Sequence, residues 1–333
     1  MSEHEYDVVA VGNAIVDIIR RCDDNFLVAV GAHKGHMTLV NSSAELADQC
    51  KRLPSGLDVA GGSAANTAVG IASFGGKAAF IGKVADDHYG RIFRHDLRGT
   101  GVVFNSISTI IPGKETSRAL VLVTPDGHRT MNTYLGCSTE LDGGLIDAEL
   151  VRKAQFVYLE GYLFDRPDAK AAFRRAVEIA KANRRRVALS LSDSFCVDRH
   201  RIELLKLIRS GSVIVFANEC ELKSLYQTNA FPEALRKIGH DTPLAVVTRS
   251  DKGSIIVNRG MNLPIAPEHV SKVVDATGAG DLYAAGFLFG LARGFSFEMA
   301  GRLASFAASE TITQFGARPE VRLGHLAQMR GLL

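Results

Sequence analysis

The chain has 333 residues, of which 46% are hydrophobic and 23% are charged, a composition typical of globular proteins and unlike that of disordered ones. No apolar run approaches the roughly 18 residues of a membrane span, and 39 basic against 36 acidic residues leave a net charge of +3, too small to indicate nucleic-acid binding. Five scattered cysteines without a Cys-x-x-Cys pair, and an N-terminus without the features of a secretory signal, predict a cytoplasmic protein.

The first part of the chain predicts strands that carry one unusual acidic residue. Residues 7–12 are typical of a buried strand, and residues 14–19 form an apolar run that contains Asp17. A carboxylate in such a run must be paired or bind a polar group, and a sugar diol fits because one carboxylate accepts two hydroxyl hydrogen bonds. Residues 116–124 and 129–135 are rich in β-formers, and the Pro-Asp-Gly-His turn between them predicts a hairpin.

After residue 150 strands and helices alternate. The predicted strands are 156–159, 187–191, 213–216 and 244–248, and the predicted helices are 169–183, 202–208 and 219–226. This alternation predicts a parallel sheet covered by helices on both faces. Such sheets bind ligands at the carboxyl ends of their strands, so chemistry is expected directly after each strand.

The strongest motif is Asp-Ala-Thr-Gly-Ala-Gly-Asp at residues 275–281, followed by an apolar segment at 282–291 that predicts a buried helix. Glycines at a helix start let backbone N–H groups approach an anion, and the helix dipole adds a favourable field. Asp281 would lie in the first turn beside that anion. An isolated Asp there is usually only a cap, but its glycines and its position beside a phosphate favour a general base for an attacking hydroxyl.

Three further motifs are weaker when taken alone. Gly61-Gly62 opens an alanine-rich helix that includes Asn66, which indicates a second helix start facing a polar ligand, although a plain glycine turn fits as well. Asn218 and Glu221 share one helix face. They could organise a hydrated Mg²⁺, or they could form only an N-terminal capping box. Residues 246–253 run from a strand into a polar turn that could hold a nucleotide or be an ordinary loop.

Together these motifs, in this order, resemble the ribokinase (PfkB-type carbohydrate kinase) family, and the resemblance spans nearly the whole chain. It implies one ribokinase-like α/β domain over residues 1–333, with a doubly wound, mostly parallel sheet and helices on both faces. A small β-sheet lid would be formed by insertions at about 13–20, 31–41 and 114–135. No Gly-x-x-x-x-Gly-Lys-Ser/Thr loop is present, which excludes the P-loop kinases.

The resemblance also implies roles for the motif residues. Asp281 would be the catalytic base, Gly278, Ala279 and Gly280 would form the anion hole, and Arg129 would lie near the transferred phosphate. The nucleotide would be bound by Asn218, Glu221, Thr248, Ser250, Gly253 and Thr277. Glu221 would hold Mg²⁺ through water, and Asp275 with loop carbonyls near Gly316 would hold K⁺.

Within the family, the chain is similar to the adenosine kinases and their bacterial relatives, which implies transfer of phosphate from ATP to the 5′-hydroxyl of adenosine. Asn13 and Asp17 would hold the ribose, alternate side chains of the lid would cover the base, and Phe195 would lie against it. The aromatic position expected after Gly161 falls on Tyr162 or Leu163. The implied substrate-binding residues are Asn13, Asp17, Met37, Gly61, Gly62, Ser63, Asn66, Ala119, Met131, Thr133, Leu135, Leu163 and Phe195.

Several alternatives stay open at this stage. A ribokinase- or fructokinase-type sugar kinase shares the motifs, and a phosphosugar acceptor would need extra basic residues, for which Arg118 and Arg129 are the candidates. A catalytically silent nucleoside sensor would not need Asp281, and a dinucleotide oxidoreductase would need a Gly-x-Gly-x-x-Gly loop after the first strand. The expected partners are ATP and a nucleoside or sugar, without nucleic acid or membrane, in a monomer or a homodimer formed through the lid.

Overall fold

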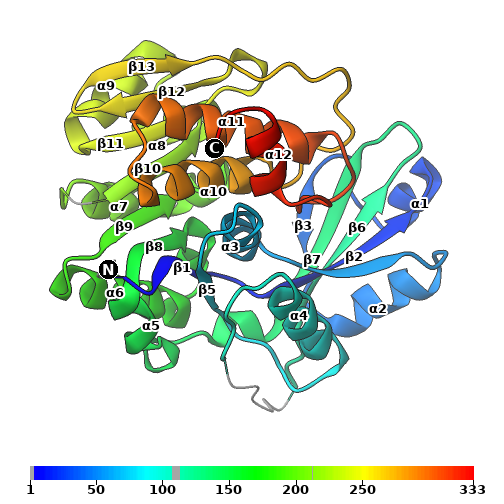
Figure 1. Ribbon diagram of the computed structural model, residues 1–333. Coiled ribbons are helices and arrows are strands. Elements are labelled where there is room, and N and C mark those ends of the chain that lie inside the picture. The colour runs from blue at the N-terminus through cyan, green and yellow to red at the C-terminus, as the bar shows by residue number, and fades with distance from the viewer. Residues whose placement is uncertain (1–3, 107–112, 212) are drawn as a thin grey trace.

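An eight-stranded sheet runs through the larger part of the molecule, and a five-stranded sheet stands at one side of it (Figure 1). The computed structural model describes residues 4–106, 113–211 and 213–333. The large sheet has the order β13-β12-β11-β10-β9-β8-β1-β5. Its strands are β1 (Tyr6–Val11), β5 (Ala78–Ile81), β8 (Ala154–Glu160), β9 (Arg186–Ser190), β10 (Val213–Asn218), β11 (Leu244–Thr248), β12 (Ser254–Asn258) and β13 (Met261–Ile265).

The large sheet confirms the predicted doubly wound, mostly parallel architecture. The neighbouring strands β5, β1, β8, β9, β10 and β11 pair in parallel. Strands β12 and β13 extend the edge next to β11 as an antiparallel hairpin. Parallel strands buried on both faces read as continuous apolar runs, which is why the sequence located most of them. Their carboxyl ends meet at one edge, so the residues that follow β1, β8, β9, β10 and β11 come together there.

Helices cover both faces of the large sheet and bury two apolar cores (Figure 1). One core receives side chains from α3 (Ser63–Ser73), α4 (His88–Gly99), α10 (Ala279–Ala292), α11 (Phe297–Ile312) and α12 (Leu323–Met329). The other receives them from α5 (Ala148–Lys153), α6 (Pro167–Ala182), α7 (Ser194–Ile208), α8 (Glu219–Tyr226) and α9 (Phe231–Asp241). From Leu282 to Leu291 helix α10 is buried all round, as its apolar sequence there requires.

Helix α7 begins at Ser194, although the sequence predicted a helix only from residue 202. The Asp193 side chain caps it by accepting a hydrogen bond from the Cys196 N–H at 2.6 Å. Its first half, up to a kink at His200, carries a charged run that hides the helical periodicity. The early start places Phe195 in the first turn of a helix rather than in a loop.

The small sheet has the order β3-β7-β6-β2-β4 and contains parts of all three insertions that were predicted to form a lid. Its strands are β2 (Ile15–Arg21), β3 (Met37–Leu39), β4 (Leu57–Gly61), β6 (Ser117–Val123) and β7 (Arg129–Tyr134). Strand β4 was not predicted, because it is short, contains Asp58 and runs into the glycine pair. Its end at Gly61 leads directly into α3, so the small sheet is continuous with the large body at this point.

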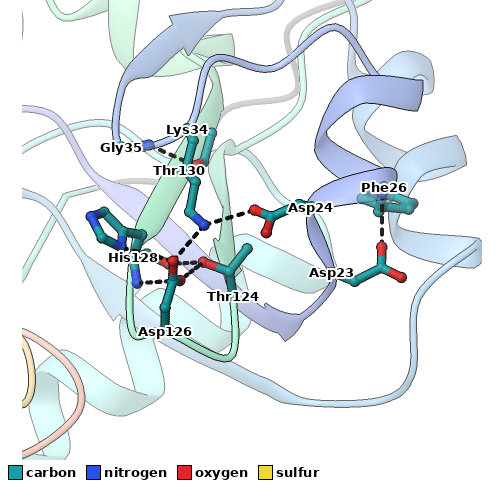
Figure 2. Close-up of polar contacts among 9 residues, drawn as sticks. All are labelled: Asp23, Asp24, Phe26, Lys34, Gly35, Thr124, Asp126, His128 and Thr130. Carbon is teal, nitrogen blue, oxygen red and sulfur yellow. Dashed lines mark hydrogen bonds and ion pairs between the residues drawn. The ribbon is translucent and has the colours of Figure 1, made fainter.

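Polar contacts join the segment before β3 to the β6–β7 hairpin (Figure 2). Lys34 Nζ lies 2.7 Å from Asp24 Oδ1 on α1 (Asp24–Ala29) and 2.5 Å from Asp126 Oδ2 in the hairpin turn. The Gly35 N–H donates to Thr130 Oγ1 at 3.0 Å. These contacts fix β3 beside β7, with Met37 opposite Met131.

The two faces of the small sheet differ. One face packs on α1 and α2 (Ser43–Lys51), where Ile18, Leu27, Leu46 and two leucines of β6 form a separate apolar core. The other face carries Ile15, Asp17, Ala119 and Met131 and turns toward the large sheet. None of the helices in the described part of the chain has the length and apolarity that crossing a lipid bilayer requires.

Candidate active site

A cavity of about 560 Å³ lies between the carboxyl edge of the large sheet and the small sheet. It brings together motifs that are up to 268 residues apart in the chain, from Asn13 to Asp281 (281 − 13). The predicted residues that line it are Asn13, Asp17, Met37, Gly62, Ser63, Asn66, Ala119, Met131, Thr133, Leu135, Phe195, Asn218, Glu221, Thr248, Thr277, Gly280 and Asp281. The nucleotide and acceptor positions predicted from sequence therefore border one continuous space.

The loop before α10 has the geometry of an anion site. Gly278 is the N-cap residue with φ of 77°, and no side chain caps the helix. A Cβ at Gly278 would come within 2.6 Å of the Ala317 backbone oxygen, so both the left-handed conformation and the close approach require glycine. At Gly280 a Cβ would meet nothing within 4 Å. The start of α10 thus presents N–H groups without a side-chain cap beside open space, although that of Ala279 already donates to the Ala276 carbonyl at 3.3 Å.

Asp281 lies in that first turn, and its carboxylate is held from a different helix. Ser63 Oγ donates to Oδ1 at 2.6 Å and Asn66 Nδ2 donates to Oδ2 at 3.0 Å. Burial raises the pKa of Asp281 to about 6, while the hydrogen bonds from Ser63 and Asn66 oppose the rise. The sequence assigned Ser63 and Asn66 to substrate binding; the structure shows that both line the cavity and also orient Asp281.

Arg129 reaches from β7 of the small sheet to the loop before α10. Its Nη2 lies 2.6 Å from Asp275 Oδ2, and its Nη1 lies 3.5 Å from Thr277 Oγ1. The Asp275 carboxylate also accepts hydrogen bonds from the N–H groups of Thr277 (3.0 Å) and Gly316 (2.8 Å). Its side chain is only 2% exposed, so one buried negative charge already carries a guanidinium and two N–H donors. Arg129 therefore already pairs with the carboxylate that the family resemblance implies as part of a K⁺ site.

Asn218 and Glu221 form a complete capping box at the start of α8. Asn218 Oδ1 accepts from the Glu221 N–H at 2.8 Å, and Glu221 Oε2 accepts from the Asn218 N–H at 3.0 Å. Burial raises the pKa of Glu221 to about 7. Both oxygens of Glu221 are engaged by Asn218, yet the residue lines the cavity, so it fits the second sphere of a hydrated Mg²⁺ rather than direct ligation. No group of three or more His, Cys, Asp or Glu side chains that could hold a metal occurs in the described residues.

Asp17 and Asn13 lie on the other side of the cavity, with Glu160 behind them. Glu160 Oε1 accepts hydrogen bonds from the Asn13 N–H (2.7 Å) and Nδ2 (2.6 Å), and Oε2 accepts from the Ala64 N–H (2.9 Å). These bonds orient Asn13, whose side-chain oxygen accepts no hydrogen bond from the described residues. Burial raises the pKa of Asp17 to about 6, opposed by the charges of Arg318 and Arg129. A Cβ at Gly61 would lie 2.3 Å from Asp17 Oδ2, so glycine is needed to seat this carboxylate.

Sequence reasoning missed Glu160, although a signal was present. The residue ends the buried strand β8 and directly precedes Gly161, which is where chemistry is expected in a parallel sheet. The segment after β8 also shows which of Tyr162 and Leu163 faces the cavity. Tyr162 lines the cavity, whereas Leu163 is fully buried in the core under α6, because the short 3₁₀ turn there rotates successive side chains to different sides. Leu163 is therefore wrong as a substrate contact.

A few other predicted residues do not line the cavity. Ser250 and Gly253 form a tight turn after β11, in which the Arg249 N–H donates to the Gly253 carbonyl at 2.8 Å. Gly61, Asp275, Gly278 and Ala279 are not among the cavity's lining residues, and Arg129 and Gly316 border a neighbouring cavity instead. Arg118 is buried against Tyr89 and Tyr134, outside the cavity, and pairs with Glu115. It is not available to an acceptor.

Comparison with known proteins gives a consistent family. The sequence profile of the pfkB family carbohydrate kinases matches residues 7–322. A crystal structure of adenosine kinase from Sinorhizobium meliloti is 47% identical, covers 98% of this chain and 99% of that one, and superposes with a TM-score of 0.92. A structure of a probable sugar kinase from Rhizobium etli CFN 42 is 44% identical, covers 99% and 100%, and has a TM-score of 0.93. A 5-dehydro-2-deoxygluconokinase from Bacillus licheniformis is 23% identical over 94% of this chain and 91% of its own.

Proposed function

Because the chain belongs to the pfkB family of carbohydrate kinases, we propose that it transfers the γ-phosphoryl group of ATP to the 5′-hydroxyl of adenosine. The family places it among sugar and nucleoside kinases, and the adenosine kinase at 47% identity supports the finer assignment. The observation that carries the proposal is the arrangement of Asp281 beside the uncapped start of α10, at one end of a cavity with an apolar wall.

In the proposed reaction the 5′-oxygen attacks the γ-phosphorus in line. The new oxygen–phosphorus bond forms as the bond to the β-phosphate oxygen breaks, and Asp281 accepts the hydroxyl proton. A pKa of about 6 leaves most of Asp281 ionised at pH 7 while keeping it basic enough to assist. The N–H groups of residues 278–280 and the Arg129 guanidinium stabilise the charge on the transferring group, which provides most of the rate in such reactions.

Mg²⁺ held through water by Glu221 would neutralise the ATP phosphates when bound. On the opposite side of the cavity, the side-chain oxygens of Asn13 and Asp17 accept hydrogen bonds from the ribose hydroxyl groups. Asp17 belongs to the small sheet, so ribose binding and closure of this sheet over the cavity support each other. Closure excludes water, which limits wasteful hydrolysis of ATP.

The wall of the cavity favours a nucleoside over a free sugar. Met37, Leu39 and Met131 from the small sheet line it, and Phe195 from α7 lines it with 67% of its surface exposed. A planar base covers such apolar surface, whereas ribose or fructose would leave it in water. Stacking of a base on an aromatic ring contributes about 1–3 kcal/mol.

The runner-up is a sugar kinase, which the names of two relatives suggest. A phosphorylated sugar would need cations in the acceptor part of the cavity. Only two basic residues of the described chain line it, Arg166 and Arg199, and Arg199 is already paired with Asp165 at 3.0 and 2.8 Å. A neutral acceptor fits this distribution better.

An assay of ADP formation with a panel of acceptors tests the proposal. We expect kcat/KM for adenosine to exceed that for ribose, fructose and fructose 6-phosphate by at least about 100-fold, because only adenosine covers the apolar wall. 5′-Deoxyadenosine is the matched control: it should inhibit competitively without turnover. The variant Phe195→Ala should raise the KM for adenosine and leave that for ribose unchanged. A preference for any free sugar would overturn the adenosine assignment.

A further inference from the structure

Arg318 is a charged residue at the back of the site to which the proposed reaction gives no role. It lies after α11, next to Ala317, whose backbone contacts Gly278 at the start of α10. Its Nε donates to Asn66 Oδ1 at 3.0 Å, and Asn66 Nδ2 in turn donates to Asp281. One amide side chain therefore separates this guanidinium from the proposed base.

The Arg318 side chain is partly buried and has no direct anionic partner. Its Nη2 atom is buried and has no hydrogen-bond partner, and no carboxylate in residues 4–106, 113–211 or 213–333 lies within ion-pair distance. Asp17, Asp96 and Asp281 act on it only at longer range. Burial lowers the pKa of Arg318 to about 10, so it still carries its charge at neutral pH.

Arg129, at the same place, has the direct anionic partner that Arg318 lacks, although its own Nε and Nη2 are also buried without a hydrogen-bond partner. Its side chain is nearly buried and pairs with Asp275 at 2.6 Å. A buried cation that lacks such a partner is costly, and its neighbours usually supply the counter-charge. Since the described residues supply none to Arg318 directly, the missing anion is expected to come from a ligand.

The position of Arg318 indicates which ligand group that is. Arg318 and Arg129 border a second cavity that shares Asp17 and Asn66 with the first. Of the shared residues, Asp17 belongs to the predicted ribose site and Asn66 donates a hydrogen bond to Asp281, so the boundary between the cavities joins the ribose site to the base. The reacting end of the acceptor must come to this boundary, because the hydroxyl has to reach Asp281.

We propose that Arg318 is a second arginine of the transfer point, which binds an oxygen of the phosphate monoester formed on the acceptor. The inference rests on the proposed kinase reaction and goes beyond it by assigning product binding to a residue after α11. The same chemistry could serve a phosphate that the acceptor already carries, as in a phosphosugar. The experiment distinguishes these two sources.

Isothermal titration of the full-length protein with adenosine and with AMP tests the assignment. In Arg318→Gln we expect AMP affinity to fall about 10- to 100-fold, the usual effect of losing charge-assisted hydrogen bonds. Adenosine affinity should stay within about 3-fold, because adenosine has no phosphate. The kcat should fall together with AMP affinity while the KM for adenosine changes little. Arg322→Gln, an exposed arginine four residues later, is the matched control and should leave both affinities unchanged.

Arg318→Lys keeps the charge but loses the planar fork, so it should bind AMP with intermediate affinity. It also keeps the test usable if Arg318→Gln does not fold, which a thermal unfolding curve would show. Equal losses for adenosine and AMP would mean that Arg318 only orients Asn66, and unchanged AMP binding would mean that it contacts no phosphate; either result overturns the proposal.

The fructose 6-phosphate arm separates this inference from the adenosine assignment. If the wild-type protein turns over fructose 6-phosphate and not adenosine, the adenosine proposal fails. A selective loss of fructose 6-phosphate binding in Arg318→Gln would then assign Arg318 to the phosphate of the acceptor. Phosphate binding by Arg318 would stand, but its role as a product ligand would be overturned.

Discussion

Helices α8 and α10 both begin at the carboxyl edge of the large sheet and border the same cavity, but they treat their first N–H groups in opposite ways. In α8 the side chains of Asn218 and Glu221 occupy the donors through a capping box. In α10 the N-cap residue is Gly278, which has no side chain to do so. The acidic residue in its first turn, Asp281, is held by Ser63 and Asn66 of α3.

This difference has a direct chemical consequence. A helix start that satisfies its own donors gains local stability and offers little to an anion. A helix start without a side-chain cap leaves donors and the positive end of the dipole for a ligand. At the edge of this sheet, the absence of a cap in α10 is therefore more informative about phosphate binding than the presence of polar residues in α8.

The largest effect is expected from Asp281→Asn. If Asp281 is the base, kcat should fall by about 10²- to 10⁴-fold, while adenosine affinity measured by titration should change little. A steady-state assay with saturating substrates measures the loss. Near-normal turnover in this variant would remove the assignment of Asp281.

The pH profile gives an independent control for the same residue. Burial raises the pKa of Asp281 to about 6, so the base is protonated and inactive below that pH. In the wild-type protein kcat should therefore rise about tenfold per pH unit below 6 and level off above it. Asp17 also has a pKa of about 6. The residual activity of Asp281→Asn separates the two carboxylates. The part of the acidic pH dependence that disappears in this variant belongs to Asp281.

A smaller loss of activity is expected when glycines at the start of α10 are replaced. Replacing Gly280 and replacing Gly278 should change the stability of the fold in opposite directions. Gly280→Ala adds a methyl group where nothing lies within 4 Å, so the fold should be kept or slightly stabilised while turnover falls about 10²-fold. Gly278→Ala must hold φ near 77° against the Ala317 backbone, so it should lower the melting temperature. Thermal unfolding and activity measured on both variants would separate the two roles. Full activity in Gly280→Ala would contradict an anion at this helix start.

These positions show which features of the fold and the site can be predicted from local sequence patterns. The large sheet, the buried helix α10 and the glycine loop before it follow from apolar runs and helix-start chemistry, which act over a few residues. The contact of Ser63 with Asp281 joins positions 218 residues apart, and no local pattern carries such a distance. For the same reason Arg129 was placed near the phosphate by resemblance, but its pairing with Asp275 was not predicted.

Side-chain direction in irregular segments was the other limit. The sequence left Tyr162 and Leu163 open, because the 3₁₀ turn after β8 has no periodicity that tells cavity from core. The resemblance implied alternate residues of the lid as substrate contacts, and Met131 and Thr133 of β7 and Leu135, directly after it, all line the cavity. Regular elements thus fix which side chains reach the site, and the turns between them do not.

A moderate effect is expected from Glu221→Gln in α8. Glutamine can still accept the capping-box bond from the Asn218 N–H and loses only the bond that Asn218 Nδ2 donates, so the helix should be nearly unaffected. If Glu221 also orients water on Mg²⁺, losing its charge should raise the Mg²⁺ concentration for half-maximal rate by about 10-fold or more. Glu219→Gln is the matched control, since Glu219 pairs with Lys223 and Arg249 and does not line the cavity. An unchanged Mg²⁺ dependence in Glu221→Gln would leave Glu221 as a cap alone.

The smallest effect is expected for monovalent cations. The Asp275 carboxylate is buried and already carries the Arg129 guanidinium, so a K⁺ ion there would place a second cation on one negative charge. Activity should therefore differ by less than about 2-fold between K⁺, Na⁺ and tetramethylammonium at equal ionic strength, since screening of exposed charges is then the same. In Arg129→Gln the carboxylate loses its cation, and K⁺ should partly restore the rate where tetramethylammonium does not. Strong, saturable activation of the wild-type protein by K⁺ would show that Arg129 does not replace the ion, and that the starts of α8 and α10 both depend on added cations.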